Sequence, residues 1–526
     1  MVDKQTLNPL ISLSLGKIRG AQRTSVYGIS YLSFEGIPYG QPPVGKLIFK
    51  SPQPALPWKG IKNCSENPPI PLQKNFETSE VMGSEDCLNL NVYMNQLAPA
   101  KRLPVLVWIF GGGFYMGQAN RKYYSPDYFL DRDVIVVTIN YRVCSLGFLS
   151  VKDPKMQIPG NAGLKDQVLA LKWIKHNIAY FNGDPQNVTL FGISSGAACV
   201  HYHLIMDLSK GLFHKAICMG ESALSPWACA PSRNNAFNLA KLHGYAGVNN
   251  DRQVVEFLNS LEAEKLVNHD LMSEEELGYG IAGSFGICVE PYANDDSAVP
   301  KDPIEMIANG WGNSIPLIIG GTADEGLIAR YFLTEGALDS PPVGQLPLAF
   351  HEKYDKEALR AMRNKLLDIH VEKGMLMGKL HKSSIDYYSI FLVWHGIHRS
   401  ILARLFYGSG PTYVYHFDFD SSSFSHLRKR FCGTDLDCGV AHAEEVSYIW
   451  FGDFSWKLEP TSREFKMIDT MIGICTNFAK YSNPGIDEWQ PVDRFEPTLC
   501  FNISNNSQVK ISPKTEMLSV WDSLYI

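Results

Sequence analysis

Residues Val188–Val200 read VTLFGISSGAACV. A run of β-branched and apolar residues stops at Gly192, and a run of small, helix-compatible residues begins after Gly196. Between them stands Ser194, two residues from either glycine. This G-x-S-x-G pattern is typical of a sharp strand-to-helix turn, in which glycine is needed because the turn crowds its neighbours. Such a turn would hold the Ser194 hydroxyl at the carboxyl edge of a sheet, beside the positive end of a helix. The pattern predicts a nucleophilic serine.

A second glycine cluster follows another apolar run. The three glycines Gly111–Gly113 come directly after Val105–Phe110. Attack of a serine on an ester produces an oxyanion, which has to be met by preorganised N–H donors. We expect the amides of Gly112, Gly113 and Ser195 to form this oxyanion hole. A triple glycine also occurs in phosphate-binding loops, but no Lys-Ser/Thr pair follows this one.

The rest of the chain predicts an α/β fold. Short β-branched runs alternate with helical patterns, which is typical of a large, mostly parallel sheet flanked by helices. Apolar residues recur at helical spacing over 161–180. The stretches 234–305 and 329–404 are richer in charge and helix formers, so we expect them to form helical cap insertions over one end of the sheet. We expect one domain over residues 8–526 and an N-terminal extension over residues 1–7. The expected buried strands are Val105–Phe110, Val134–Asn140, Val188–Gly192, Ala216–Met219, Pro316–Gly320 and Thr412–Phe417.

The composition excludes several classes of protein. Of the 526 residues, 45% are hydrophobic and 19% are charged, which describes a globular chain. The net charge of −6 leaves no basic excess for a nucleic acid partner. No apolar stretch approaches the roughly 18–20 residues that a membrane helix needs. The 11 cysteines show no metal-site spacing. A homo-oligomer is compatible with the sequence, but nothing in it specifies one.

The ends of the chain carry no targeting signal that we recognise. The N-terminal stretch MVDKQTLNPLISLSLGKIRG lacks a cationic segment, a full apolar segment and a small-residue cleavage site. The C-terminal residues DSLYI contain neither a retention tetrapeptide nor a prenylation box. We therefore expect a cytoplasmic protein.

Four further segments extend the two glycine motifs. They are Phe34–Tyr39 (FEGIPY), Ser84–Leu88 (SEDCL), Asn140–Arg142 (NYR) and Pro159–Gln167 (PGNAGLKDQ). With them the chain resembles the type-B carboxylesterase and cholinesterase family of α/β-hydrolases, and within it the insect alpha-esterases, over about Leu15 to Trp521. The resemblance implies an α/β-hydrolase fold with a helical cap over a gorge. It also implies a serine esterase with a Ser-Glu-His triad that needs no cofactor or metal.

This fold supplies an acid and a histidine after the serine, in that order. Asp324 and Glu325 both follow the strand Pro316–Gly320, and chemistry alone accepts either carboxylate. The family's Glu-Gly pattern selects Glu325. His426 and His442 both follow the last expected strand, and spacing does not separate them. The family's aromatic segment after the catalytic histidine selects His442.

The chain departs from the family pattern around the site. Phe110 stands where esterases commonly have His, before the glycines. In the turn, Ile193 replaces the usual Glu and Ser195 replaces the usual Ala, which keeps the backbone donor. Gly220-Glu221 stands where relatives carry Ser-Gly, so a hydroxyl expected to help hold the acid is missing.

Two further positions bear on stability. Ile48 stands where the family has an Arg that pairs with Glu85, so this carboxylate is expected to lack its partner and to destabilise the fold. Cys64 and Cys87 match a disulfide of secreted relatives. In a reducing compartment we expect two free thiols.

The same residues suggest the substrates. Ile193 removes a negative charge beside the nucleophile, and the segment 65–86 has no Trp, so a choline ester would lack both its carboxylate and its aromatic face. Trp227 matches the family's acyl-pocket aromatic residue, and we expect Tyr124, Phe110 and Ile193 to line the substrate pocket with it. The sequence predicts hydrolysis of small neutral carboxylic esters with short to medium acyl chains, through an acyl-enzyme intermediate.

Other readings stay open. One is a catalytically slow or inactive member that binds ligands or sequesters xenobiotics such as organophosphates. Another is an amidase or a thioesterase, which would use the same three residues. The triad residue types are all retained here, and this favours the esterase.

Overall fold

The structure is a computed structural model of the whole chain. The expected N-terminal extension, residues 1–7, lies outside the residues that it describes. Those residues are 8–75, 78–95, 101–231, 233–267, 271, 283–332, 338–371, 376–377, 379–433, 436, 438–453 and 455–525.

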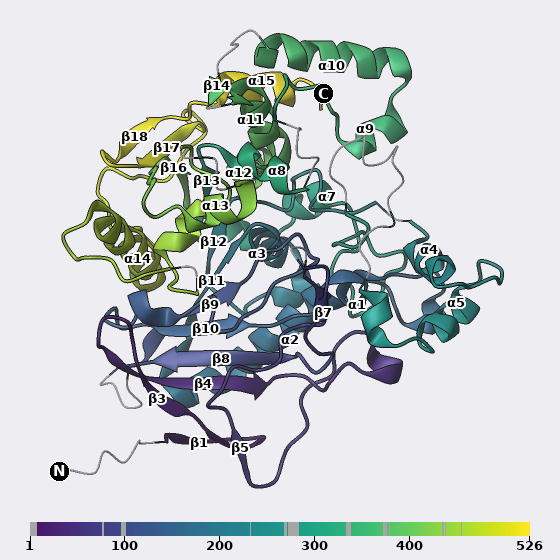
Figure 1. The fold of residues 1–526 in the computed structure, drawn as a ribbon, viewed down its shortest axis with the longest axis vertical. Helices are drawn as coiled ribbons and strands as arrows, with labels where there is room; N and C mark the ends of the chain where they lie inside the picture. Colours follow the sequence, from purple (N-terminus) through teal and green to yellow (C-terminus); the bar gives the residue numbers. More distant parts are fainter. Residues whose placement is uncertain are drawn as a thin grey trace.

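A large mixed sheet passes through the middle of the molecule (Figure 1). Its centre, from β17 to β10, is parallel, while β8, β4 and β3 at one edge and β18 at the other run antiparallel to their neighbours. Parallel neighbours need long crossovers, and helices supply most of them here. In sheet order the strands are β18 (Gln508–Ile511), β17 (Leu499–Ile503), β16 (Thr412–Phe417), β13 (Leu317–Thr322), β12 (Lys215–Met219), β11 (Gly183–Ile193), β9 (Leu103–Ile109), β10 (Ile135–Ile139), β8 (Asn89–Met94), β4 (Ser30–Pro38) and β3 (Ala21–Thr24).

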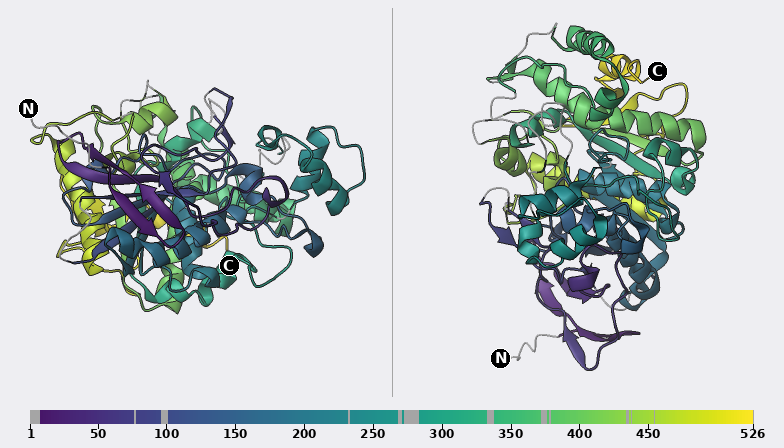
Figure 2. Two further views of the ribbon diagram at one scale, coloured as in Figure 1. Left: turned by 90° about the horizontal axis from the view of Figure 1, so that it is seen from below. Right: turned by 90° about the vertical axis from the view of Figure 1, so that its right-hand side faces the viewer.

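The described residues also form three smaller sheets, which are separate from the large one. The short strands β1, β2 and β5 form a separate sheet at the N-terminal end of the long axis, opposite the C-terminal helix α15 (Figures 1 and 2). Two hairpins, β6 with β7 and β14 with β15, complete the strands of the described residues. Their bounds are β1 (Leu10–Leu13), β2 (Gly16–Arg19), β5 (Ile61–Asn63), β6 (Gln73–Lys74), β7 (Val81–Met82), β14 (Leu376–Met377) and β15 (Leu380–His381).

Helices cover the sheet and form the expected insertions. Helices α2, α3 and α14 contact the central strands, while α4 and α5 project to one side and α9 and α10 lie at the far end (Figures 1 and 2). In the part of the chain that the structure describes, no helix is both long and apolar enough to cross a bilayer. The helices are α1 (Cys144–Phe148), α2 (Ala162–Asn177), α3 (Ser195–Ile205), α4 (Asn235–Leu242), α5 (Asp251–Leu258), α7 (Pro303–Ala308), α8 (Ala329–Phe332), α9 (Leu348–Lys353), α10 (Lys356–Val371), α11 (Lys382–Ser389), α12 (His395–Tyr407), α13 (His426–Cys432), α14 (Arg463–Tyr481) and α15 (Thr515–Asp522).

The predicted α/β architecture with a helical cap is confirmed, with shifted boundaries. Strand β9 ends at Ile109, so Phe110 already belongs to the following loop. The helix expected over 161–180 is α2, which ends at Asn177 and continues as a 3₁₀ turn.

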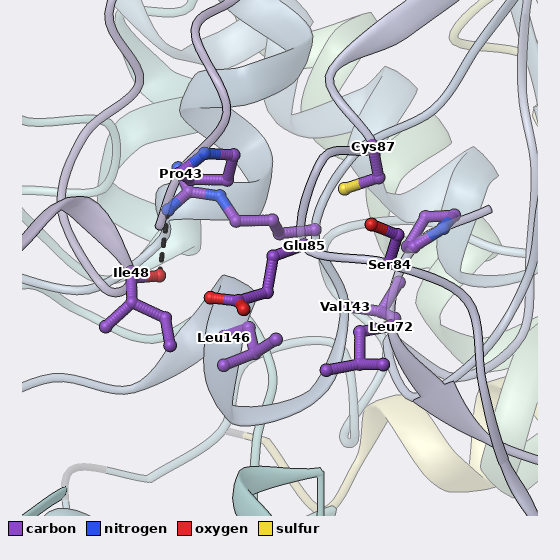
Figure 3. A pocket seen from close by; sticks show the side chains of 10 residues that line it. Pro43, Ile48, Leu72, Ser84, Glu85, Cys87, Val143 and Leu146 are labelled. Carbon is purple, nitrogen blue, oxygen red and sulfur yellow. Dashed lines mark hydrogen bonds between the residues drawn. The ribbon is translucent and has the colours of Figure 1, made fainter. Parts of the chain in front are cut away.

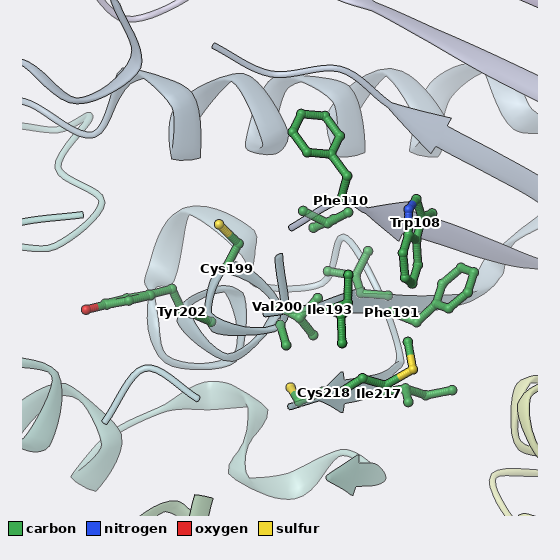
Figure 4. Packing of buried hydrophobic residues seen from close by; sticks show 14 of the residues in the cluster. Trp108, Phe110, Phe191, Ile193, Cys199, Val200, Tyr202, Ile217 and Cys218 are labelled. Carbon is green, nitrogen blue, oxygen red and sulfur yellow. The ribbon is translucent and has the colours of Figure 1, made fainter. Parts of the chain in front are cut away.

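A buried aromatic cluster supports the strand that leads to Ser194. The ring of Trp108 on β9 lies 4.8 Å from that of Phe191 on β11 and 5.3 Å from those of Tyr124 and Trp450. Trp108 and Phe191 are fully buried, and Figure 4 shows them packed together beside the turn. Burying one large apolar side chain contributes about 1.5–3 kcal/mol. The end of β11 therefore sits on a rigid support.

Candidate active site

Ser194 sits in a strained turn between β11 and α3. Its φ of 56° and ψ of −130° are uncommon for a residue other than glycine, and its N–H donates to the carbonyl of Met219 at 2.9 Å. A Cβ on Gly192 would lie 2.7 Å from the carbonyl oxygen of Gly196, and a Cβ on Gly196 would overlap that of Ile109. The two flanking glycines are needed because backbone occupies the space of any side chain.

The structure separates the two candidate carboxylates. Glu325 is fully buried at the end of β13, accepts the Thr322 N–H at 2.7 Å, and is hydrogen bonded to Nδ1 of His442. Asp324 instead accepts from the N–H of Val440 at 3.0 Å and pairs with Lys382 at 3.2 Å. Only Glu325 orients the imidazole.

Two buried carboxyl groups raise the pKa of His442. Burial acts to lower the pKa of His442, but the charge and hydrogen bond of Glu325, together with the charge of Glu445, outweigh burial and raise it. Glu445 is a buried carboxyl that accepts the Tyr415 hydroxyl at 3.0 Å. Sequence reasoning did not assign it, although two acidic residues, Glu444 and Glu445, follow His442 after a single alanine and were a visible signal. His426, the alternative histidine, begins α13, and its side chain lies outside the described part.

The serine and the histidine both lie beside the end of β12. Gly220 directly follows Met219, whose carbonyl holds Ser194, and it adopts a φ of +62°. A Cβ on Gly220 would lie 3.1 Å from Cε1 of His442 and 3.2 Å from Oε1 of Glu325. Ser194 and His442 also line the same cavity, which encloses about 230 Å³.

The glycine loop beside Ser194 presents free amides. Gly112 and Gly113 have φ values of 129° and 63°, and the Gly112 carbonyl is turned away to accept from Tyr115 and Met116. Within the described residues, the N–H groups of Gly112, Gly113 and Ser195 donate no hydrogen bond. Successive unpartnered N–H groups at a helix start suit an anion.

Two of the four expected pocket residues line the cavity. Tyr124 and Ile193 do, together with the side chains of Met116, Tyr331, Phe431 and Trp450, which sequence reasoning did not name. Trp450 belongs to the aromatic segment that follows His442, so a signal for it existed. The remaining three, Met116, Tyr331 and Phe431, come from a loop and two separate helices, and no signal for them was present in the sequence.

Phe110 and Trp227 lie elsewhere. The ring of Phe110 is fully buried and stacks on Tyr141 at 4.3 Å, pointing away from Ile193 in Figure 4. Its ring fills the space under the glycine loop because Gly117 packs against it without a side chain. Trp227 donates from Nε1 to the Leu392 carbonyl at 3.0 Å, and neither residue is among those that line the cavity.

A second, small cavity surrounds Glu85 (Figure 3). Its carboxylate lies between the apolar side chains of Ile48 and Leu146. Arg142, which also lines this cavity, is bound to Asp166 at 2.6 Å and to the Ile48 carbonyl at 3.1 Å. Among the described residues, Glu85 makes no ion pair.

Replacing Glu85 by glutamine is expected to stabilise the protein slightly at neutral pH. Burial and then the charge of Glu264 raise the pKa of Glu85, so ionisation costs more in the folded than in the unfolded state. This penalty is full above the folded pKa and disappears as the pH falls to about 4.3, the usual value. Solvent screening keeps the gain well below about 1 kcal/mol. The melting temperature should rise by about 1 °C at neutral pH and not near pH 4.

The exposed Glu488 provides the matched control. Replacing it by glutamine removes the same charge from a solvated site, so the melting temperature should stay constant. An equal rise in both variants, or one that persists in acid, would show that burial of Glu85 has no energetic cost.

Both cysteines of the disulfide found in secreted relatives, Cys64 and Cys87, are buried and free in the structure. Burial raises the pKa of the Cys64 thiol to about 12. Neither is therefore a reactive thiolate at neutral pH.

The chain is similar to known proteins over almost its whole length. Residues 7–521 match the model of the carboxylesterase family. Esterase B1 of Culex pipiens is 33% identical, with 98% of each chain covered, and venom carboxylesterase-6 of Apis mellifera is 30% identical, with 97% of this chain and 92% of the relative covered. The crystal structure of juvenile hormone esterase from Manduca sexta, with OTFP covalently attached, superposes with a TM-score of 0.84 at 28% identity, covering 98% of this chain and 99% of that one.

The expectation of a cytoplasmic protein is wrong. A venom carboxylesterase acts in a secreted fluid, and this relative is similar over nearly the whole chain, so the family context points away from the cytoplasm. The expectation rested on the two ends of the chain, where no targeting signal was recognised, and such local patterns do not carry the family context. With the family model matched from residue 7 to residue 521, the chain belongs to the carboxylesterase family.

Proposed function

We propose that Ser194, Glu325 and His442 are the catalytic triad of this carboxylic ester hydrolase. The observation that carries the assignment is the Glu325–His442 hydrogen bond in the wall of the cavity that Ser194 also lines. Glu325 holds the imidazole in the tautomer whose Nε2 can accept a proton. The raised pKa of His442 keeps its protonated form stable during the reaction.

The residues then have defined roles in acyl transfer. His442 takes the proton of the Ser194 hydroxyl, and the oxygen attacks the ester carbonyl. The amides of Gly112, Gly113 and Ser195 receive the oxyanion, and His442 returns the proton to the leaving alcohol. Water, deprotonated by the same histidine, then attacks the acyl-enzyme and releases the acid.

The cavity supports neutral esters as substrates. Of the described residues that line it, Arg430 and His442 are the only ones with basic side chains, and none is acidic. Aromatic residues such as Tyr124 and Trp450 do line this cavity, so the expected lack of an aromatic face does not hold. A quaternary ammonium group would still meet no carboxylate there and would be repelled by Arg430, which disfavours choline esters. The juvenile hormone esterase that this fold matches has OTFP covalently attached, and the mechanism proposed here likewise passes through a covalent intermediate.

Labelling with a fluorophosphonate probe tests the assignment. We expect the wild-type chain to be labelled at one site and the Ser194→Ala variant to remain unlabelled, because the phosphonate reacts only with an activated serine. Equal labelling of the two proteins would reject Ser194 as the nucleophile. With p-nitrophenyl acetate we expect continuous turnover after any initial burst. One fast equivalent followed by no further product would instead identify a sequestering protein.

A further inference from the structure

The supports of all three triad residues meet in the turn Gly220–Ser225, which follows β12. The residue before it, Met219, holds Ser194, and Gly220 packs on His442 and Glu325. The N–H of Gly220 also donates to the carbonyl of Gly320 on β13 at 2.7 Å. A shift of this turn would therefore move every member of the triad.

The turn is also bonded to the nucleophile helix. The N–H of Ala223 donates to Nδ1 of His201 on α3 at 3.2 Å. His201 is fully buried, and burial lowers its pKa to about 3, with a further contribution from Arg404. The ring is neutral at physiological pH, so Nδ1 is free to accept this bond.

Glu221 occupies the centre of the turn with a side chain that the mechanism does not use. It is fully buried, and its Oε1 accepts the N–H of Ser222 at 2.9 Å and the hydroxyl of Ser225. Its Oε2 is closed to solvent and has no hydrogen-bond partner among the described residues. The side chain thus ties both ends of the turn together.

The chemistry of the site indicates that this carboxyl is neutral. Burial raises the pKa of Glu221 well above its usual value, and the charge of Glu325 adds to this, while the Ser222 N–H and the indole of Trp227 act in the opposite direction. A buried carboxylate beside Glu325 would be repelled by it, whereas a carboxylic acid is not.

We propose that Glu221 is a positioning residue of the esterase. As a hydrogen-bonded carboxylic acid it locks the turn Gly220–Ser225 against the Glu325–His442 pair. The inference rests on the triad proposed above. It gives a role to a buried carboxyl that the proposed mechanism does not use.

Two variants of the full chain test this role. Glu221→Gln keeps the shape, both acceptor bonds and neutrality, so we expect kcat per titrated active site within about twofold of wild type. Glu221→Ala releases the turn, and we expect kcat to fall by about 10- to 100-fold while KM changes less than about threefold. Active sites are counted by fluorophosphonate labelling, so partial unfolding does not count as lost turnover.

The pH profile provides the readout that a purely structural role would not move. The titratable groups that face the turn are Glu325, His442, His201 and Cys218. We expect the acidic limb of the kcat/KM profile to stay in place in Glu221→Gln. In Glu221→Ala we expect this limb to move, because the contact between Glu325 and His442 loosens. If Glu221→Ala matches wild type per site, Glu221 positions nothing. If Glu221→Gln is as slow as Glu221→Ala, the positioning role of Glu221 requires an ionised carboxylate and the proposal is wrong.

Ser225→Ala guards against a variant that does not fold. It removes only the hydroxyl donor to Glu221, and we expect kcat per site to fall by about three- to tenfold. An unchanged kcat would contradict the positioning role of Glu221. Loss of labelling in wild type would overturn the triad itself, whereas failure at Glu221 leaves wild-type labelling intact, so the two proposals fail separately.

Discussion

The Glu325→Gln variant is expected to hydrolyse a neutral p-nitrophenyl ester about 10³- to 10⁴-fold more slowly in kcat than wild type. The amide can donate to Nδ1 of His442, which holds the imidazole in the wrong tautomer. The pH profile should change as well. The charge and hydrogen bond of Glu325 raise the pKa of His442 against the opposing effect of burial. Because the free base is the active form, activity falls as the pH drops through that pKa, and removing the charge should move this acidic limb to lower pH.

Asp324→Asn is the matched control, because it neutralises the adjacent carboxylate. Asp324 bonds to Val440 and Lys382 and not to His442. We expect this variant to lose some thermal stability but to keep kcat within about threefold of wild type, with the acidic limb unchanged. Steady-state rates from about pH 5 to pH 9 measure both effects. An equal loss in the two variants, or an acidic limb that Glu325→Gln leaves in place, would contradict the role given to Glu325.

The parallel strands of the large sheet could be predicted from the sequence because they are buried on both faces. Continuous β-branched runs such as that of β10 can serve few other purposes. The two outermost antiparallel strands, β3 and β18, escaped prediction for the opposite reason. Strand β3 alternates between partly buried and exposed residues, and β18 is mostly exposed, so neither carries an apolar run. Their pairing is decided by tertiary contacts that a local pattern does not contain.

The site shows the same division between backbone and side chain. The turn at Ser194 and the glycine loop are features of the backbone, and the glycines in the sequence predict both of them. The direction of a side chain just past a strand end is not encoded in this way. Phe110 was expected in the pocket. Strand β9 ends one residue before Phe110, and the Phe110 ring stacks on Tyr141 instead. The choice between Asp324 and Glu325 likewise needed the family pattern, since adjacent carboxylates differ only in where the loop points them.

The Gly112→Ala variant is expected to lower kcat by at least about 10²- to 10³-fold, the cost of one lost oxyanion donor. A Cβ at Gly112 would overlap the carbonyl oxygen of Met116, and its φ of +129° disfavours any L-residue. The loop would have to move, and the unpartnered amides would move with it. Because these donors meet the charge that develops during attack, KM should change far less than kcat. Steady-state hydrolysis of a p-nitrophenyl ester measures both constants.

Gly211→Ala separates loss of the oxyanion hole from the general cost of a left-handed residue. Gly211 is exposed, has a φ of +72°, and a Cβ there would meet nothing within 4 Å. We expect this variant to lose about 1 kcal/mol of stability and no activity. If Gly112→Ala kept its kcat while Gly211→Ala was equally destabilised, the oxyanion would have to be held by donors outside the glycine loop. A drop in kcat confined to Gly112→Ala would instead tie the glycine loop to the transition state, because both variants place an L-residue at positive φ and only Gly112 lines the cavity that contains Ser194.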